Sequence, residues 1–459
     1  MAGAAGQEYD VVILGGGSGG YACALRAAEL GLKVALVEKD LLGGTCLHRG
    51  CIPTKALIHA AEVADAARDS EAVGVRATFE SIDMAGVNKY KDGVVARLYK
   101  GLQGLVKSRK VELVAGAGRL VAKDTVEVDG RRYTGKHVVL ASGSYSRSLP
   151  GLEIGGRVIT SEQALQLDSV PDRVVVLGGG VIGVEFASVW KSFGADVTIV
   201  EALPHLVPLE DEASSKALER AFRKRGIAFS LGVRFKGVEQ TDSGVVVSLE
   251  DGKTFEADLL LVAVGRGPNT ANLGYEEQGI TMDRGFVLTD ERLRTNVEGV
   301  HAVGDIVPGL QLAHRGFQQG IFVAEDIAGL EPAVIDETGI PKVTYSDPEV
   351  ASVGLTEAKA REKFGDVEVV EYNLGGNGRS QIIGTTGFVK LVRQKDGPVV
   401  GVHMVGARIG EQVGEAQLIV NWEAFPEDVA ALVHAHPTQN EALGEAHLAL
   451  AGKPLHSHS

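Results

Sequence analysis

Residues 9–20 read Tyr9-Asp-Val-Val-Ile-Leu-Gly-Gly-Gly-Ser-Gly-Gly20, an apolar run that leads straight into closely spaced glycines. The apolar run predicts a buried strand, and the glycines predict a tight turn into a helix, followed by a second strand that ends in Glu38. Gly15, Gly17 and Gly20 would let a pyrophosphate approach the helix N-terminus, and the terminal acid would accept hydrogen bonds from ribose hydroxyls. This stretch therefore predicts a dinucleotide-binding Rossmann unit.

The same pattern returns 163 residues later in the chain. The run Arg173-Val-Val-Val-Leu177 leads into Gly178, Gly180 and Gly183, and the following strand ends in Glu201. In both copies the acid stands 23 residues after the first glycine. A single glycine motif is weak evidence, but two copies with the same flanking elements indicate two dinucleotide sites. Two sites imply two cofactors, most simply a flavin and a nicotinamide.

The second terminal acid also bears on the choice of nicotinamide cofactor. Glu201 is followed by Ala202-Leu-Pro-His-Leu206, which holds no Lys or Arg to bind a 2′-phosphate. A carboxylate at this place accepts a hydrogen bond from the ribose 2′-hydroxyl and repels a phosphate there. The sequence therefore favours NAD over NADP.

Two of the three cysteines, Cys46 and Cys51, lie in the run GGTCLHRGCIPTK at residues 43–55, shortly after the first Rossmann unit. A redox-active disulfide, half of a zinc site and two unrelated buried cysteines are all compatible with this spacing. A structural zinc site commonly has four ligands, and only Cys23 is left to supply more sulfur. The neighbouring nucleotide motif favours the redox disulfide, and we assign no metal site.

The spacing of the two cysteines sets a condition on the local backbone. Five residues of regular helix would separate their Cα atoms by about 7.5 Å, whereas a disulfide needs about 4.4–6.8 Å. A bridge therefore needs a distorted helical turn, which Gly50 permits. Pro53 is expected in the first turn of the helix that follows. A helix N-terminus near Cys51 would favour the thiolate of that residue.

From about residue 340 the pattern changes to short apolar runs that precede helical stretches. The predicted strands cover residues 342–345, 387–393 and 399–404, and the predicted helices cover residues 411–422, 426–433 and 441–451. We therefore expect an α/β protein with two Rossmann-like dinucleotide-binding domains and a C-terminal α+β domain.

A second chemical cluster is the run Val433-His-Ala-His-Pro-Thr-Gln-Asn-Glu441. A thiol redox cycle needs a group that takes a proton from an incoming dithiol, and histidine titrates in the right range. Glu441 is the local carboxylate that could orient a histidine ring. A surface loop with two histidines remains the alternative.

Charge and composition exclude several classes of function. The formal net charge is −14, which argues against binding to the phosphate backbone of nucleic acid. No apolar run reaches about 18 residues, so we expect no membrane span. The first eight residues lack a basic segment followed by an apolar one, so they do not read as a signal peptide. Three cysteines suit a catalytic pair in a reducing compartment, and we expect a cytoplasmic protein.

Eight motifs, read together, resemble those of the flavin-dependent pyridine nucleotide-disulfide oxidoreductases. In chain order after the first glycine motif they are GGTCLHRGCIPTK, ASGS, GGGVIGVE, VAVGRGPN, AVGD, LAHRGFQQG, IPKVTYSDPEVASVGLTE and HAHPTQNE. The resemblance covers nearly the whole chain and is closest to members that oxidise dihydrolipoyl groups. The few departures include His48 and Arg49 between the cysteines, and none removes a catalytic group.

The resemblance implies where the cofactors bind. FAD would lie in the first Rossmann unit, with Glu38 on the adenosine ribose and Asp305 on the ribityl chain. NAD would lie in the second unit, with Glu201 on its ribose. Five further residues join the expected cofactor-binding set: Gly118, Ser142, Gly143, Gly265 and Ala313. The expected domains are residues 1–150 with 274–340 for FAD, 151–273 for NAD and 341–459 for dimerisation.

The resemblance also implies roles for the residues around the cysteine pair. Cys51 would be the flavin-proximal thiol, and Cys46 would be the interchange thiol that attacks or releases the lipoyl sulfur. Lys55 would lie near the flavin and pair with Glu185.

A base and an overall reaction follow from the same resemblance. His436, oriented by Glu441, would be the acid–base group and act on the disulfide of the partner subunit, so we expect a homodimer. The implied activity is oxidation of dihydrolipoyl groups on an acyltransferase or carrier protein, with reduction of NAD, in a 2-oxo acid dehydrogenase complex or in glycine cleavage. The alternative is a glutathione-reductase-like enzyme that uses NADPH, and Glu201 argues against it.

Overall fold

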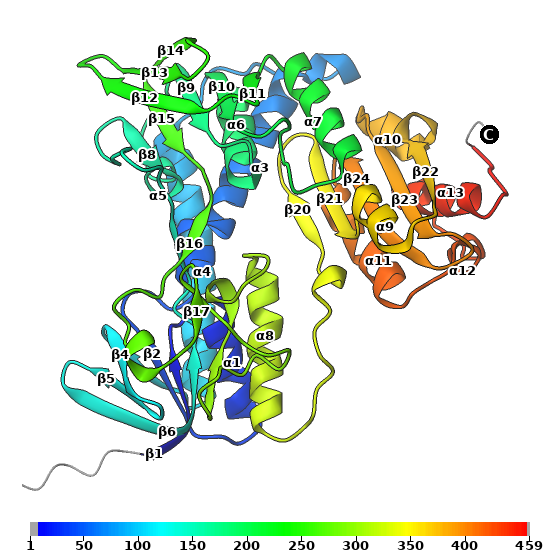
Figure 1. Ribbon diagram of the computed structural model, residues 1–459. Helices are drawn as coiled ribbons and strands as arrows, with labels where there is room; N and C mark the ends of the chain where they lie inside the picture. The colour runs from blue at the N-terminus through cyan, green and yellow to red at the C-terminus, as the bar shows by residue number, and fades with distance from the viewer. Residues whose placement is uncertain (1–7, 457–459) are drawn as a thin grey trace, which may run out of the picture.

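The computed structural model describes residues 8–456; the first seven of the eight residues whose sequence argues against a signal peptide lie outside this range, as do residues 457–459. Two mainly parallel sheets and one antiparallel sheet form three units (Figure 1). This is the predicted fold class, with two Rossmann-like units and a C-terminal α+β unit. Among the described residues, no helix combines the length and the apolar character that crossing a bilayer requires.

The first unit is built on a seven-stranded sheet with the order β3-β2-β1-β6-β5-β4, and β19 pairs with β6. Its strands are β1 (Glu8–Leu14), β2 (Val34–Glu38), β3 (Glu112–Ala115), β4 (Gly118–Ala122), β5 (Thr125–Val128), β6 (Arg131–Leu140) and β19 (Val300–Ala302). Helices α1 (Ser18–Glu29) and α8 (Ala313–Ile327) meet through glycines, because a β-carbon on Gly320 would lie 2.2 Å from the Gly19 carbonyl oxygen. Their close approach brings two helix N-termini to one end of the sheet.

The second unit repeats this plan with a five-stranded parallel sheet of order β11-β10-β9-β15-β8. Its strands are β8 (Val158–Thr160), β9 (Arg173–Leu177), β10 (Asp196–Glu201), β11 (Ala228–Leu231) and β15 (Leu259–Val262), and its helices are α5 (Ser161–Ala164), α6 (Val181–Phe193) and α7 (Glu212–Lys224). An antiparallel layer of β12 (Phe235–Gln240), β13 (Val245–Leu249) and β14 (Thr254–Ala257) adjoins it. The antiparallel ribbon of β7 (Ser144–Ser146) and β16 (Arg266–Pro268) carries the chain from the first unit to the second and back.

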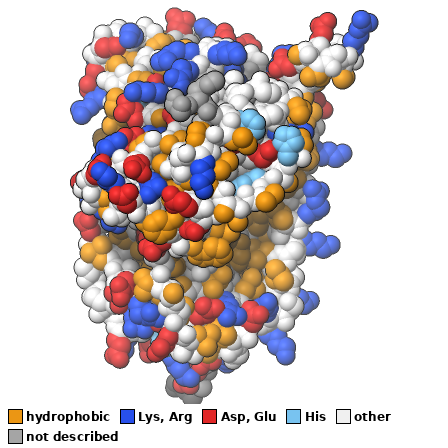
Figure 2. Space-filling view, turned by 90° about the vertical axis from the view of Figure 1, so that its right-hand side faces the viewer, with side chains coloured by type: hydrophobic (Ala, Val, Ile, Leu, Met, Phe, Trp, Pro, Cys, Tyr) orange, Lys and Arg blue, Asp and Glu red, His pale blue; other side chains and the backbone are white. Residues whose placement is uncertain are grey.

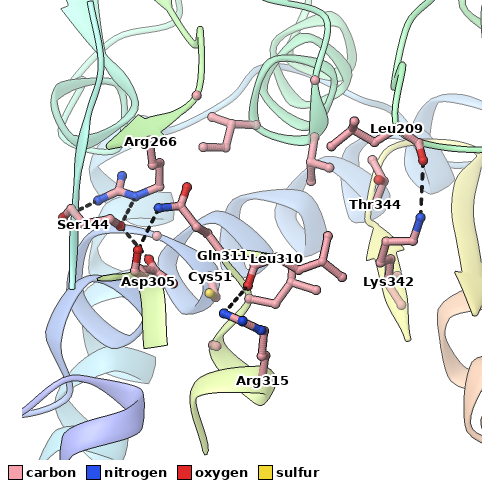
Figure 3. A pocket seen from close by; sticks show the side chains of 18 of the residues that line it. Cys51, Ser144, Leu209, Arg266, Asp305, Leu310, Gln311, Arg315, Lys342 and Thr344 are labelled. Atoms are coloured by element: carbon pink, nitrogen blue, oxygen red, sulfur yellow. Dashed lines mark hydrogen bonds between the residues drawn. The ribbon is translucent and has the colours of Figure 1, made fainter. Parts of the chain in front are cut away.

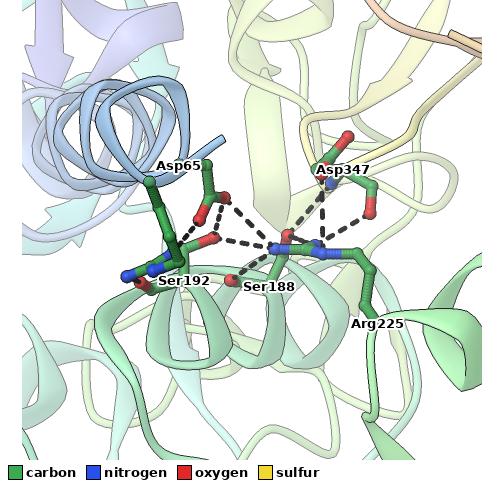
Figure 4. A network of polar contacts seen from close by, with 6 residues as sticks. Asp65, Ser188, Ser192, Arg225 and Asp347 are labelled. Atoms are coloured by element: carbon green, nitrogen blue, oxygen red, sulfur yellow. Dashed lines mark hydrogen bonds and ion pairs between the residues drawn. The ribbon is translucent and has the colours of Figure 1, made fainter. Parts of the chain in front are cut away.

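A helical layer connects the two Rossmann units. It contains α2 (Gly44–Arg49), α3 (Cys51–Arg68) and α4 (Met84–Ser108), and α3 packs against α6. Arg225, which follows α7, stabilises this contact. Its guanidinium donates hydrogen bonds to the hydroxyl oxygens of Ser188 and Ser192 on α6, each at 2.7 Å. It also forms an ion pair with Asp65 of α3 at 3.6 Å. It also donates to the carbonyl oxygen of Asp347 at 2.9 Å (Figure 4). One largely buried cation thus joins α3, α6 and the C-terminal unit.

The C-terminal unit is an antiparallel sheet of order β20-β21-β24-β23-β22 with helices around it. The strands are β20 (Lys342–Thr344), β21 (Glu349–Gly354), β22 (Val367–Asn373), β23 (Phe388–Gln394) and β24 (Val399–Gly406), and the helices are α9 (Glu357–Phe364), α10 (Gly378–Ile383), α11 (Ile409–Asn421), α12 (Pro426–Ala430) and α13 (Glu441–Leu450). The helix predicted over residues 426–433 ends at Ala430, because residues 431–433 are exposed and gain nothing from helical packing. Figure 1 shows α13 at the outer edge of this unit, away from α3.

Candidate active site

The two cysteines stand on either side of a break between helices. Helix α2 carries Cys46 and ends at Arg49, and α3 begins at Cys51. Gly50 lies between them with φ −148° and ψ −109°, outside the helical region. The chain therefore contains the distorted turn that the spacing requires, and it puts Cys51 at the N-terminus of an 18-residue helix.

The two thiols have opposite acidities. Both are free in this structure, and the Cys46 thiol donates a hydrogen bond to the Cys51 sulfur. That hydrogen bond, together with the charge of Lys55, lowers the pKa of Cys51 to about 7 against the opposing effect of burial. The same hydrogen bond and burial raise the pKa of Cys46. Near neutral pH Cys51 is therefore the thiol of the pair that ionises, and Cys46 keeps its proton.

Lys55 lies one helical turn beyond Cys51, with its ammonium against the Glu185 carboxylate at 2.9 and 2.8 Å. The side chain of Glu185 is 4% exposed and also accepts a hydrogen bond from the Tyr345 amide at 2.9 Å. Burial disfavours the charged form of Lys55, but the charge of Glu185 and its hydrogen bonds outweigh burial and raise the pKa of Lys55. A fixed positive charge therefore stands beside the Cys51 thiolate.

A cavity of about 1790 Å³ opens between the three units. It exceeds the roughly 300–1,000 Å³ of ordinary ligand pockets and has room for two extended cofactors. The expected site residues that line it are Gly17, Cys46, Cys51, Lys55, Gly143, Gly178, Gly180, Glu185, Glu201, Gly265, Asp305 and Ala313. Both glycine turns and both thiols therefore face one continuous space.

Six expected cofactor-binding residues are not among the residues that line the cavity: Gly15, Gly20, Glu38, Gly118, Ser142 and Gly183. Gly118 faces the core, since a β-carbon there would lie 2.6 Å from the Leu14 side chain. The hydroxyl of Ser142 accepts a hydrogen bond from the buried Tyr275 at 2.9 Å. The contacts of Gly118 and Ser142 with a cofactor stay predictions.

The first glycine turn fits a pyrophosphate. Gly15 has φ +114°, and a β-carbon there would lie 2.2 Å from the Ala141 carbonyl oxygen, so no other residue fits. A β-carbon on Gly20 would lie 1.8 Å from the Gly15 carbonyl oxygen, which closes the helix onto the strand. A β-carbon on Gly17 would meet only open space on the cavity side. Gly17 is also the N-cap of α1 and offers no side-chain cap, so the first amide groups of the helix face the place where an anion would lie.

The second turn has the same geometry. Gly178 has φ +112° and a carbonyl oxygen 2.3 Å from its β-carbon position, and Gly180 faces open space. The terminal acids also match: Glu38 accepts from the Gly16 amide at 2.7 Å, and Glu201 accepts from the Gly179 amide at 2.7 Å. The duplication seen in the sequence is therefore a duplication of two anion-binding turns, each with an oriented carboxylate.

Asp305 belongs to a chain of polar groups that the sequence did not reveal. The Ser144 hydroxyl donates to Asp305 Oδ2 at 2.5 Å, and Arg266 donates to that hydroxyl at 2.7 Å and to the Ser144 carbonyl oxygen at 2.9 Å (Figure 3). Burial lowers the pKa of Arg266 in spite of the Asp305 charge. Ser144 and Arg266 stand in the ASGS and VAVGRGPN motifs, but only the pairing of β7 with β16 brings them together.

One cation on the cavity wall is far in sequence from the second terminal acid. The amide of Val233 donates to the Glu201 carbonyl oxygen at 3.3 Å, so the next residue, Arg234, joins the same part of the wall. Residues 202–206 hold no Lys or Arg, but an arginine from another part of the chain therefore lines the same cavity. This nearby arginine has no local sequence signal that would have revealed it.

His436 and Glu441 form a pair away from the cysteines. His436 Nδ1 lies 2.7 Å from Glu441 Oε1, and the Thr438 amide donates to Glu441 Oε2 at 2.7 Å. Burial opposes ionisation of Glu441, but these two hydrogen bonds outweigh it and lower the pKa of that carboxyl. The His436 side chain is 78% exposed, and the cavity lining among residues 8–456 includes neither member of the pair. Within one chain the structure does not bring this histidine to the thiols.

Comparison with known proteins agrees with this architecture. Residues 9–320 match the family described as pyridine nucleotide-disulphide oxidoreductase, and residues 340–447 match its dimerisation domain. The chain is 40% identical to a dihydrolipoyl dehydrogenase of Bacillus subtilis, over 98% of this chain and 99% of the other. It is also 40% identical to the dihydrolipoyl dehydrogenase of Geobacillus stearothermophilus, over 98% and 97%. The leghemoglobin reductase of Vigna unguiculata is 39% identical over 98% of this chain and 89% of its own.

Solved structures give the same answer. LpdA from Mycobacterium tuberculosis superimposes with a TM-score of 0.90 at 28% identity, over 96% of this chain and 99% of the other. The HOCl-induced flavoprotein disulfide reductase RclA from Escherichia coli superimposes with a TM-score of 0.86 at 26% identity, over 96% and 99%. With the paired thiols, the two anion-binding turns and the C-terminal match, the chain belongs to the pyridine nucleotide-disulphide oxidoreductase family and carries its dimerisation domain.

Proposed function

We propose that this protein oxidises dihydrolipoyl groups and reduces NAD, with FAD as its tightly bound cofactor. The observation that carries the proposal is the unequal pair Cys46 and Cys51, which faces one cavity together with both glycine turns. The names of relatives about 40% identical over nearly the whole chain support it. When bound, FAD supplies the transfer of two electrons between the thiol pair and a nicotinamide.

The cysteines carry out the exchange with substrate. A dihydrolipoyl dithiol reduces the Cys46–Cys51 disulfide: its two thiols become the lipoyl disulfide, and the two cysteines receive two electrons. We assign the exchange with the lipoyl sulfur to Cys46, which holds the proton of the reduced pair because its pKa is raised, while Cys51 is the thiolate beside Lys55. The electrons then pass to NAD, which becomes NADH, and one proton is released.

The second subunit completes the site. We assign the proton transfer to His436 of one chain acting on the disulfide of the other, because this exposed dyad lies outside the cavity of its own chain. Trp422 and Val433 on the same unit are 75% and 99% exposed, so this unit carries large apolar side chains that a partner subunit could cover. Figure 2 shows histidine side chains at the surface of this face, with apolar side chains around them. A homodimer would bury these groups.

The wider setting of the reaction follows from the substrate. We assign the dihydrolipoyl group to a separate acyltransferase or carrier protein of a 2-oxo acid dehydrogenase complex or of glycine cleavage, in the cytoplasm. The domain division is residues 1–150 with 274–340 for FAD, 151–273 for NAD and 341–459 for the interface. The β7–β16 ribbon, where the chain crosses between the Rossmann units, supports the first two boundaries.

The test is a steady-state assay of the purified, FAD-loaded protein. NAD should be reduced with dihydrolipoamide at a rate well above that with NADP. A clear preference for oxidation of NADPH by glutathione disulfide would replace the proposal with the glutathione-reductase-like alternative. A sedimentation measurement on the same sample should give twice the chain mass.

A further inference from the structure

The loop that carries His436 contains a second histidine–carboxylate pair. His434 stands two residues earlier, and its Nε2 lies 2.8 Å from Oε1 of Glu415 on α11. Unlike the exposed His436, the His434 side chain is only 14% exposed. A largely buried pair therefore lies directly behind the exposed one.

Glu415 holds both ends of this loop. Its Oε1 meets His434 at the start of the loop, and its Oε2 accepts a hydrogen bond from the Asn440 side-chain amide at 2.6 Å. Asn440 is the N-cap of α13 and directly precedes Glu441, the partner of His436. The His436–Glu441 dyad therefore lies between two residues, His434 and Asn440, that both contact the Glu415 carboxylate.

Helix α13 is shaped to receive the His434 ring. A β-carbon on Gly444 would lie 2.6 Å from Nδ1 and 2.9 Å from Cε1 of that ring. The imidazole thus lies against helix backbone, in space that any side chain at position 444 would occupy.

The charges around His434 make the pair electrically coupled to the dyad. Within the described chain, the titratable groups that face His434 are Glu415 on α11 and Glu441 and His447 on α13. The hydrogen bond and charge of Glu415 raise the pKa of His434, while burial lowers the pKa of His447 to about 4 and keeps it neutral. His434 and Glu415 therefore favour each other's charged forms at a place close to Glu441.

We propose that His434 and Glu415 are positioning residues of the thiol–disulfide reaction. Together they hold the His436–Glu441 dyad in place, and the charge of His434 offsets that of Glu415 beside the dyad. The proposal rests on the proposed role of His436 as the base. The proposal has two parts that can be tested separately. The charge statement is that the cation of His434 offsets the Glu415 carboxylate, and the geometry statement is that the His434 ring positions the dyad.

The charge statement is tested by a double-mutant cycle. In His434→Gln the Glu415 carboxylate loses its cation, and the added negative charge stabilises the protonated imidazole of His436. The acidic limb of the pH profile of kcat/KM for dihydrolipoamide should then move up by about half a pH unit. In His434→Gln with Glu415→Gln the extra charge is gone, and the limb should return to its wild-type position. If the acidic limb lay at the same pH in the wild type and in both variants, the charge statement would be overturned.

The geometry statement is tested by Gly444→Ala, which alters no titratable group. Alanine favours a helix by about 1 kcal/mol over glycine, so any loss of activity reports the displaced His434 ring rather than a weakened α13. We expect at least a several-fold fall in turnover with dihydrolipoamide, with unchanged FAD content. Wild-type turnover in Gly444→Ala would overturn the geometry statement.

His436→Gln separates this inference from the proposed function. Turnover in that variant should fall by about 10²-fold or more, as is typical for loss of a general base. Unchanged turnover in His436→Gln would remove the dyad from the reaction and sink the proposed role. A large loss in His436→Gln together with wild-type behaviour of His434→Gln and Gly444→Ala would sink only the positioning pair.

Discussion

The Lys55 ammonium lies 2.8 Å from Glu185 Oε2, and this contact joins the helix that starts at Cys51 to the helix that starts at the second glycine turn. The helix with the thiolate and the helix with the nucleotide-binding turn are thus joined by one half-buried ion pair. The Tyr345 amide, which also donates to Glu185, extends the contact to the C-terminal unit. The cation beside the thiolate is therefore fixed by all three units of the fold.

Removal of the Lys55 charge should make Cys51 less acidic. The pKa of Cys51 is held near 7 by the Cys46 hydrogen bond and by the Lys55 charge, so Lys55→Met should raise it. The thiolate absorbance of the reduced protein should then appear at a higher pH than in the wild type. A pH titration followed in the ultraviolet measures the change.

A matched control uses a lysine whose charge does not reach the thiols. Lys395 is 55% exposed and pairs with Asp366 on the surface, so Lys395→Met should leave the thiolate titration where it is. The same midpoint in Lys55→Met and wild type would show that the Cys46 hydrogen bond alone lowers the pKa of Cys51.

Replacement of Cys46 should separate cofactor binding from thiol exchange. Cys46→Ser removes the exchanging sulfur but leaves both glycine turns in place, so we expect full FAD content and no turnover with dihydrolipoamide. Cys23→Ala is the control, because that thiol is fully buried in α1 and its pKa is raised to about 12, which makes it unreactive. Turnover that survives in Cys46→Ser would exclude the disulfide from the reaction.

Apart from the Lys55–Glu185 pair, which the family resemblance implied, the features that could be predicted are those contained in short stretches of sequence. Each glycine turn lies within six residues, and its backbone leaves room for no other residue at Gly15 or Gly178. The distorted turn at Gly50 follows from helix geometry and a five-residue spacing. Local patterns of this kind determine local backbone, so they survive the folding of the rest of the chain.

The contacts that escaped prediction all join residues far apart in the sequence. Arg266 reaches Ser144 only because β7 and β16 pair, and Glu415 reaches His434 only because α11 packs beside the loop before α13. Arg234 joins the cavity wall through a single amide contact of its neighbour with the strand that ends in Glu201. Such pairings depend on the packing of whole units, which no short motif records.

Coenzyme choice should depend on the balance between Glu201 and Arg234. The carboxylate of Glu201, oriented by the Gly179 amide, repels a 2′-phosphate, whereas Arg234 on the same wall would attract one. Glu201→Ser should therefore raise kcat/KM for NADP and lower that for NAD, and adding Arg234→Ala should reverse the gain with NADP. The measurement is the ratio of the two kcat/KM values with dihydrolipoamide in excess. A gain with NADP that persists in the double variant would exclude Arg234 as the phosphate partner.

Stability toward acid should depend on the buried His447. This ring is 0% exposed, its Nδ1 lies 2.6 Å from the Leu443 carbonyl oxygen, and burial lowers its pKa to about 4. The pKa is near 6.5 when the chain is unfolded, so the stability linked to this group is present above pH 6.5 and is lost as the pH falls toward 4. Between pH 7 and pH 5 that loss amounts to roughly 2 kcal/mol. In His447→Gln the free energy of unfolding, from urea titrations followed by circular dichroism, should fall by correspondingly less over this interval, whatever its value at pH 7. The control is His59→Gln, at a side chain that is 60% exposed, in which the free energy of unfolding should fall by as much as in the wild type. If the free energy of unfolding of His447→Gln fell by that same amount, His447 would not be held neutral in the folded chain.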